Sequence, residues 1–154
     1  MTIKIITDGA SDLPLSYIEE HHIKVVPLNV SFGEQSFKTG VDLDNKTFYK
    51  MMKEFSELPK SSCPAPYDFL DAYKEVPEDV DIIVFSLSKG LSGTYESAVL
   101  GMNMLLEEQP DRKIAVIDTK TGSCGQMLLI DDAVKLINSG ARFDEVLANA
   151  QSSI

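Results

Sequence analysis

The sequence lacks any apolar run long enough to cross a membrane. A transmembrane helix needs about 18 or more consecutive apolar residues, and charged residues interrupt every apolar stretch of this chain well before that length. The opening residues, Met1 to Asp8, are too few before an acidic residue to act as a signal peptide. We therefore expect a soluble, cytoplasmic protein without a transmembrane segment.

Positive charge is also scarce. The chain has 14 lysines and arginines against 24 aspartates and glutamates, which gives a net charge of −10. Nucleic-acid backbones and anionic membrane surfaces bind proteins mainly through cationic side chains. The composition therefore disfavours nucleic acid and anionic membrane surfaces as partners.

Cysteine and histidine are nearly absent. Cys63 and Cys124 form no C-x-x-C pair, and neither has a histidine at the spacing of a metal site. We expect two free, buried thiols. No metal ion or other cofactor is expected.

Two common catalytic motifs are missing as well. The segment Gly90-Leu91-Ser92-Gly93-Thr94 has threonine where the serine hydrolase motif G-x-S-x-G ends in glycine, and no histidine follows residue 22. The phosphate-binding motif G-x-x-x-x-G-K-[ST] does not occur either. These absences argue against a serine hydrolase and against a nucleotide phosphotransferase.

The apolar pattern predicts one α/β domain. With 154 residues, of which 44% are hydrophobic, the chain can bury one good core. Apolar strands alternate with segments of helical period, which is typical of a mainly parallel sheet covered on both faces. We predict a three-layer α/β/α sandwich with about five strands. The expected strands are 3–7, 24–30, 81–85 and 113–117, with a short extended or hairpin segment over 32–39.

The loop after the third of these strands has the composition of an anion-binding site. It lies where a strand ends and a helix begins, so backbone N–H groups and a partial positive charge are available to a carboxylate or phosphate. Glycines allow the backbone to approach a ligand closely. Hydroxyl donors come from Ser86, Ser88, Ser92 and Thr94, and the glycines are Gly90 and Gly93.

Four motifs in order resemble those of the DegV family of bacterial fatty-acid-binding proteins. Any one of them alone would be weak, but their order and spacing make the resemblance specific. The match runs from the first strand to the helix after Gly125. The motifs are Thr7-Asp8-Gly9-Ala10-Ser11-Asp12-Leu13-Pro14, Lys60-Ser61-Ser62-Cys63-Pro64, Leu91-Ser92-Gly93-Thr94-Tyr95-Glu96-Ser97-Ala98, and Ile117-Asp118-Thr119-Lys120-Thr121-Gly122-Ser123-Cys124-Gly125-Gln126.

The resemblance implies a carrier for a long-chain fatty acid and not an enzyme. Such a protein holds the acid in a tunnel between two domains and presents its carboxyl group to a separate fatty acid kinase, which makes acyl-phosphate for phospholipid synthesis. Carried onto this chain, the carboxylate ligands are Ser61 and Ser92. Additional candidates near them are Ser62, Leu91, Gly93, Thr94 and Met127.

The chain departs from the family pattern in its first loop. Gly9 and Ala10 stand where the family usually has serine or threonine, so two hydroxyl donors are missing and a ligand role for this loop is weakened. Asp8 and Asp12 are interpreted as cap and turn residues, because two carboxylates without a third ligand make a poor metal site.

The resemblance also implies a second domain of similar size, which closes the tunnel. Residues 1–154 are expected to form a single α/β domain equivalent to the family's first domain, with the second, lipid-binding domain absent from this chain. The half-tunnel should then leave an apolar patch beside Ser61 and Ser92, with Leu91 and Met127 as contributors. Self-association of the domain through this patch is one expected consequence.

One other function uses the same residues. A small phosphate-binding or sugar-phosphate-binding α/β domain would hold its ligand with the same hydroxyl and N–H groups. The ligand that copurifies with the chain would distinguish the two functions. A long-chain fatty acid supports the first function, and a polar phosphate ester supports the second.

Overall fold

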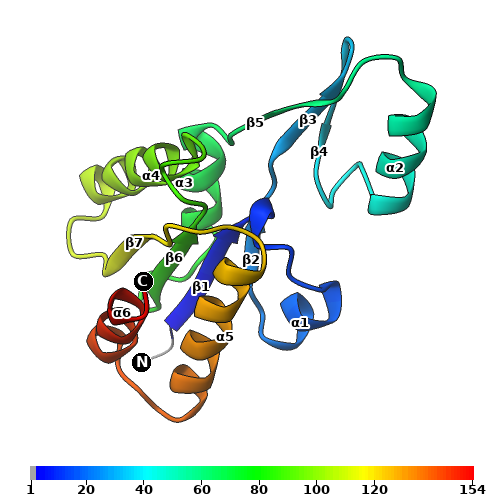
Figure 1. The fold of residues 1–154 in the computed structure, drawn as a ribbon. Coiled ribbons are helices and arrows are strands. Elements are labelled where there is room, and N and C mark those ends of the chain that lie inside the picture. The colour runs from blue at the N-terminus through cyan, green and yellow to red at the C-terminus, as the bar shows by residue number, and fades with distance from the viewer. Residues whose placement is uncertain (1–2) are drawn as a thin grey trace.

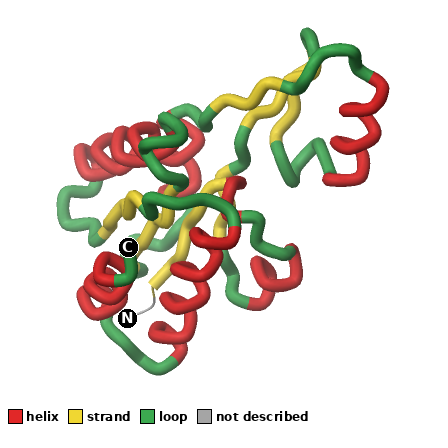
Figure 2. Tube along the Cα trace, in the orientation of Figure 1, coloured by secondary structure: helices red, strands yellow, loops and turns green. Residues whose placement is uncertain are grey.

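The computed structural model describes residues 3–154, and its central element is a four-stranded parallel sheet (Figures 1 and 2). The strands lie in the order β2-β1-β6-β7, and every neighbouring pair in this sheet is parallel. The prediction of a mainly parallel sheet is confirmed. The strands are β1 (Ile3–Asp8), β2 (Lys24–Val26), β6 (Asp81–Ser86) and β7 (Ile114–Asp118).

Helices cover both faces of this sheet, so the predicted three-layer sandwich is confirmed (Figure 1). Successive side chains of a strand point to opposite faces. On β6, Ile83 and Phe85 pack in one buried cluster, whereas Ile82 and Val84 pack in another. The first cluster includes side chains of α5 (Cys124–Asn138), α6 (Phe143–Ser152) and α1 (Leu15–Glu20), and the second includes those of α3 (Pro66–Lys74) and α4 (Thr94–Glu108).

The strand expected over residues 24–30 is divided in two, which corrects the prediction. β2 ends at Val26, and β3 (Asn29–Phe32) begins after Pro27 and Leu28. Proline has no N–H to donate to a neighbouring strand. The Leu28 N–H donates to Thr39 Oγ1 at 3.0 Å. The chain therefore leaves the parallel sheet at Pro27.

After this break the chain forms a separate unit, residues 29–62, which we call the arm. β3 pairs antiparallel with β4 (Gln35–Lys38) and with β5 (Lys60–Ser62), and α2 (Asn45–Glu54) lies between β4 and β5 in the chain. Figure 1 shows the arm projecting away from the rest of the molecule, which we call the body. The expected hairpin over 32–39 is confirmed, and the sandwich has four parallel strands where about five were expected. The body has four parallel strands and the arm has three antiparallel ones.

The arm has its own small core. Buried Val30, Phe32 and Leu43 form its centre, and partly buried side chains pack around them. The rings of Phe48 and Phe55 lie 5.7 and 5.3 Å from the ring of Phe32, measured between centroids. These residues belong to neither of the two clusters in the body. The arm and the body are therefore stabilised by separate apolar cores.

Replacing Phe32 by alanine is expected to unfold the arm while the body stays folded. Phe32 is only 1% exposed, and truncating a buried phenylalanine costs about 3–5 kcal/mol. A cluster as small as that of the arm cannot absorb such a loss, whereas the body clusters do not contain Phe32. Hydrogen exchange followed by mass spectrometry should show fast exchange in residues 29–62 and unchanged protection of β6.

The matched control is Tyr49→Ala on α2, whose side chain is 63% exposed. This change also removes an aromatic ring from the arm, but it should leave exchange in the arm nearly unchanged. If Phe32→Ala instead exposed β6 together with the arm, the two units would unfold as one, contrary to the separate cores described above.

Candidate functional site

The segment between β6 and α4, residues 87–93, is called the Ser92 loop. Its backbone folds around Ser88, because the N–H groups of Leu91 and Ser92 donate to the Ser88 carbonyl at 2.9 and 3.2 Å. α4 begins at Thr94, with Gly93 as its N-cap residue. A helix N-terminus presents free N–H groups and a partial positive charge. The loop therefore has the strand-to-helix geometry that the sequence predicts for an anion site.

The hydroxyl groups of this loop differ in their contacts. Ser92 Oγ lies 2.9 Å from Thr94 Oγ1 and accepts the Thr94 N–H at 3.3 Å. Ser88 Oγ accepts the Gly90 N–H at 3.2 Å. Thr94 and Ser88 are buried, whereas Ser92 is half-buried. When the Thr94 hydroxyl donates to Ser92, the Ser92 O–H is free to donate to a ligand.

Ser61 and Ser62 come from the arm. Both are exposed on β5, where they pair with Val30 and Asn29 of β3. The next residue, Cys63, reaches the Ser92 loop, since its Sγ would lie 3.5 Å from a Cβ atom placed on Gly93. The structure thus brings the end of β5 beside the Ser92 loop. The two predicted carboxylate ligands belong to two separately packed units.

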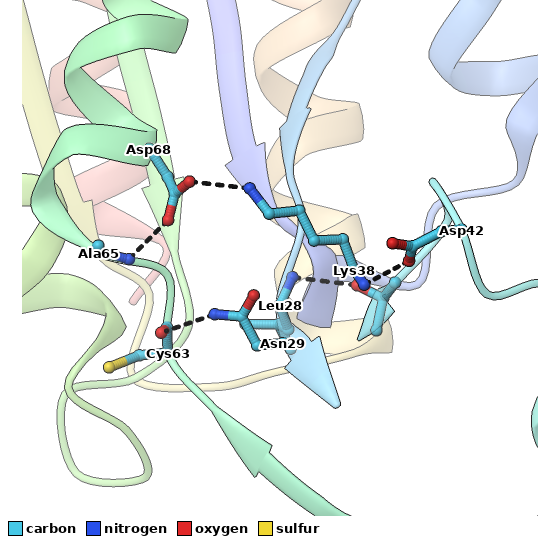
Figure 3. Close-up of polar contacts among 8 residues, drawn as sticks. Leu28, Asn29, Lys38, Asp42, Cys63, Ala65 and Asp68 are labelled. Atoms are coloured by element: carbon cyan, nitrogen blue, oxygen red, sulfur yellow. Dashed lines mark hydrogen bonds and ion pairs between the residues drawn. The ribbon is translucent and has the colours of Figure 1, made fainter. Parts of the chain in front are cut away.

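Polar contacts join the arm to the body at its base (Figure 3). The Asn29 side-chain amide donates to the Cys63 carbonyl at 3.3 Å. Lys38 Nζ of β4 lies 3.0 Å from Asp68 Oδ1 of α3, and Asp68 Oδ2 accepts the Ala65 N–H at 2.8 Å. Because the two apolar cores are separate, these contacts help to set the placement of β5 and hence of Ser61.

The two apolar candidates lie in different surroundings. Leu91, in the Ser92 loop, is 72% exposed. Met127, on α5, is half-buried and packs against the cluster that contains Ile83 and Phe85. Of the two side chains, Leu91 presents the larger part of its surface to solvent beside the predicted carboxylate site.

Three cavities of the described residues lie away from Ser61 and Ser92. One, of about 690 Å³, lies between residues 9–25 and 39–49. A second, of about 470 Å³, is lined by Ile3, His21, His22 and Val134, among others, at the amino end of β1. A third, of about 260 Å³, lies beside β2 and α3. None of these three has Ser61 or Ser92 in its wall.

Asp8 has a larger role than its sequence interpretation suggests. Its Oδ1 accepts the Ala10 N–H at 3.0 Å, which confirms the expected cap at the short 3-10 helix η1 (Gly9–Ser11). Its Oδ2 also accepts the Leu87 N–H at 2.7 Å. Turn signals describe only neighbouring residues, so they cannot predict a contact between positions 79 residues apart. The sequence signal for this second role is the position of Asp8 at the end of an apolar strand.

The cysteines are free, as expected, but neither is buried. Cys63 is half-buried beside the Ser92 loop, and Cys124 is exposed at the start of α5. Cys63 follows the exposed strand β5 and Cys124 follows the loop after β7, so neither belongs to an apolar cluster, and the prediction of burial is wrong. Across residues 3–154, no group of three or more histidine, cysteine, aspartate or glutamate residues could hold a metal ion. No helix in the same range is long and apolar enough to span a membrane.

Comparison with known proteins assigns the chain to a family. The model described as "Uncharacterised protein, DegV family" matches residues 2–153. The chain belongs to the DegV family. This confirms the resemblance carried by the four motifs, and the match extends beyond them to α6.

Curated and solved DegV relatives are similar over nearly the whole chain. The DegV domain-containing protein YteA of Lactococcus lactis is 36% identical over 150 residues, covering 96% of this chain and 52% of the relative. A fat acid (stearic acid)-binding protein from Eubacterium ventriosum superimposes with a TM-score of 0.91 at 34% identity, covering 97% of this chain and 52% of that structure.

A third DegV neighbour is named for a kinase. The Streptococcus pneumoniae Fatty Acid Kinase (Fak) B3 protein, solved loaded with linoleic acid, gives a TM-score of 0.82 at 31% identity. The match covers 99% of this chain and 54% of that structure. The chain thus spans about half the length of these DegV relatives.

Proposed function

We propose that this DegV chain takes part in binding a long-chain fatty acid, and that Ser61 and Ser92 donate hydrogen bonds to the carboxylate. One observation carries the proposal. The half-buried Ser92 hydroxyl lies at the start of α4, beside the end of the strand that carries Ser61. The solved neighbours described as binding stearic acid and as loaded with linoleic acid support this choice of ligand.

The groups at this place suit a carboxylate. A carboxylate accepts several hydrogen bonds, and bonds from hydroxyl and N–H donors to an ionised oxygen are stronger than neutral ones. Ser62 on β5 and the residues Gly93 and Thr94 at the start of α4 are the additional groups that we place near the carboxylate. The helix dipole of α4 adds favourable charge at the same position.

The hydrocarbon tail needs an apolar enclosure, and none of the three cavities described above has Ser92 in its wall. Exposed Leu91 marks where the tail would leave the carboxylate site, with Met127 as a further candidate. We infer that residues 1–154 correspond to the first of two domains and that a second domain covers the tail, since the relatives are about twice as long. The chain by itself should then bind lipid weakly or self-associate through this face.

We further propose that the chain is a carrier that presents the fatty acid to a separate fatty acid kinase. The name of the Streptococcus pneumoniae neighbour supports this partner. The serines have no histidine base beside them, because His21 and His22 line the cavity at the amino end of β1, with Ile3. A cytoplasmic location stays a prediction.

Extraction and mass spectrometry of the molecules that copurify with the chain would test this function. We expect a long-chain fatty acid that is depleted when the Ser61→Ala, Ser92→Ala double variant is purified in the same way. A copurifying phosphate ester, displaced by inorganic phosphate and not by oleate, would contradict fatty-acid binding.

The chain alone is expected to make no acyl-phosphate from ATP, magnesium and oleate. It lacks the phosphate-binding lysine motif of nucleotide phosphotransferases. Hydroxylamine trapping of acyl-phosphate, followed by mass spectrometry, would measure the product, with a purified fatty acid kinase added as the positive control. Product formed by the chain alone would contradict the carrier role.

A further inference from the structure

The end of β6 is held by side chains from three neighbouring elements. Thr7 Oγ1 of β1 and Gln126 Nε2 of α5 donate to the Phe85 carbonyl at 2.9 and 3.1 Å. Thr119 Oγ1, which follows β7, donates to the Ser86 carbonyl at 2.8 Å. All three side chains are buried. These bonds fix the backbone as far as Ser86, where the Ser92 loop begins.

The Asp8 carboxylate continues this support into the loop. Asp8 is 0% exposed. Its two oxygens accept the N–H of Leu87, the first residue of the Ser92 loop, and the N–H of Ala10 in η1, at 2.7 and 3.0 Å. Hydrogen bonds to an ionised carboxylate are among the stronger ones in proteins. One buried carboxylate therefore joins the loops that follow β1 and β6.

This carboxylate is costly for the folded protein. Burial raises the pKa of Asp8 above its usual value of 3.8, although hydrogen bonds from Leu87, Ala10, Gln126 and Ser86 lower it in part. A raised pKa means that Asp8 favours folding most at low pH, and that this contribution is lost as the pH rises through the folded-state pKa. Buried ionised groups that lower stability are typical of functional sites.

We propose that Asp8 is a positioning residue for the carboxylate site. Its carboxylate holds the Leu87 N–H and so fixes the Ser92 loop, which places the Ser92 hydroxyl where the fatty-acid carboxylate binds. Asp8 acts through the loop and not on the ligand, since it is wholly buried. The identity of the ligand in this inference rests on the function proposed above.

The first test needs neither a variant nor a ligand. In NMR spectra of the chain recorded against pH, amide protons that are bonded to a carboxylate shift when it titrates. The Leu87 and Ala10 amides should shift with one common midpoint above 3.8. The Thr47 amide is the internal control, because its acceptor Asp44 lies 2.9 Å away and has a pKa lowered by hydrogen bonds from Thr47. A Leu87 amide that does not follow the titration of Asp8 would overturn the inference.

The second test separates positioning from stability with two matched variants. Asp8→Asn should weaken oleate binding by about tenfold, because small misplacements of a binding group are costly. It should also lower Tm at pH 7.5, because the new side-chain NH2 group would face one of the two backbone N–H donors that the carboxylate accepts. Asp44→Asn makes the same change at the cap of α2. Its carboxylate accepts hydrogen bonds from Thr47 that lower its pKa, so the change should lower Tm slightly and alter oleate affinity by less than about twofold.

The possible outcomes separate the two proposals. Asp8→Asn that binds oleate as tightly as the parent chain would overturn the positioning role, because a merely structural residue would alter Tm alone. A parent chain that neither binds oleate nor self-associates would contradict the proposed function, and the Leu87 titration would still decide whether Asp8 anchors the loop. If Asp8→Asn does not fold, the titration of the Leu87 amide in the parent chain still decides whether Asp8 anchors the Ser92 loop.

Discussion

Replacing Gly101 by valine is expected to lower the free energy of unfolding by about 3 kcal/mol or more, because it forces α3 away from α4. A Cβ atom at Gly101 would lie 2.8 Å from the Pro66 carbonyl oxygen and 3.1 Å from the Leu70 nitrogen. Both are backbone atoms, so they cannot turn aside as a flexible side chain can. Real Cβ atoms essentially never approach other atoms this closely.

Urea denaturation followed by far-ultraviolet circular dichroism would measure this change. The matched control is Asn103→Val, which places the same β-branched side chain on an exposed position of α4. The control carries only the small helix-propensity cost of valine, which is a few tenths of a kcal/mol. For a domain of this size, a loss of 3 kcal/mol lowers Tm by about 6–12 °C. Equal losses in the two variants would show that α3 and α4 can separate freely at Gly101.

The parts of the fold that could be predicted depend on local patterns. β1 and β6 are runs of apolar residues, and their side chains alternate between two buried clusters, so their positions and the layered architecture follow from the sequence. Asp44 caps α2 by accepting the Thr47 N–H at 2.9 Å, and Gly140 ends α5 with a φ of 89°, as their residue types suggest.

The arm could not be predicted in the same way. β5 consists of Lys60, Ser61 and Ser62, all exposed, and no apolar period marks it as a strand. It is a strand only because β3 pairs with it. Pro27 predicts an interruption of the strand. Whether the chain only bends there or leaves the parallel sheet depends on the contact of Leu28 with the distant residue Thr39. Strands formed by non-local pairing alone leave little trace in one sequence.

The candidate site also combines parts that the sequence predicts with parts that it does not. The Ser92 loop was identified from its glycines and hydroxyl residues, whereas Ser61 was identified through the resemblance of its motif to the DegV family. That Ser61 lies beside the Ser92 loop could not be predicted, since this depends on the antiparallel pairing of β5 with β3 and on the contact of Cys63 with Gly93. The bond from the Leu87 N–H to Asp8 likewise joins two loops that only the parallel register of β1 and β6 brings together.

Ser92→Ala is expected to weaken fatty-acid binding by about 1–2 kcal/mol, or about 5-fold to 30-fold, the cost of one hydrogen bond to a charged group. Displacement of a fluorescent fatty acid by oleate would measure the loss relative to the parent chain. The control is Ser123→Ala, which removes an exposed serine from the corresponding loop before α5. Its affinity should equal that of the parent, and an equal affinity for Ser92→Ala would remove Ser92 from the site.

Combining Ser92→Ala with Ser61→Ala tests whether the two serines share one carboxylate. Each single change should cost about the same, since each removes one hydroxyl donor. If both hydroxyls bind the same carboxylate, the ligand can shift toward the remaining donors once one serine is lost, and the losses are then coupled by about 0.5 kcal/mol or more.

The arm and the body have separate cores, so a coupling between Ser61 and Ser92 would have to pass through the bound ligand or the contacts at the base of the arm. Repeating the four affinity measurements in a Lys38→Met background, which lacks the ion pair with Asp68, separates these two routes. Coupling through the ligand persists without that ion pair, whereas coupling through the base of the arm does not. Strictly additive losses would contradict a shared carboxylate site.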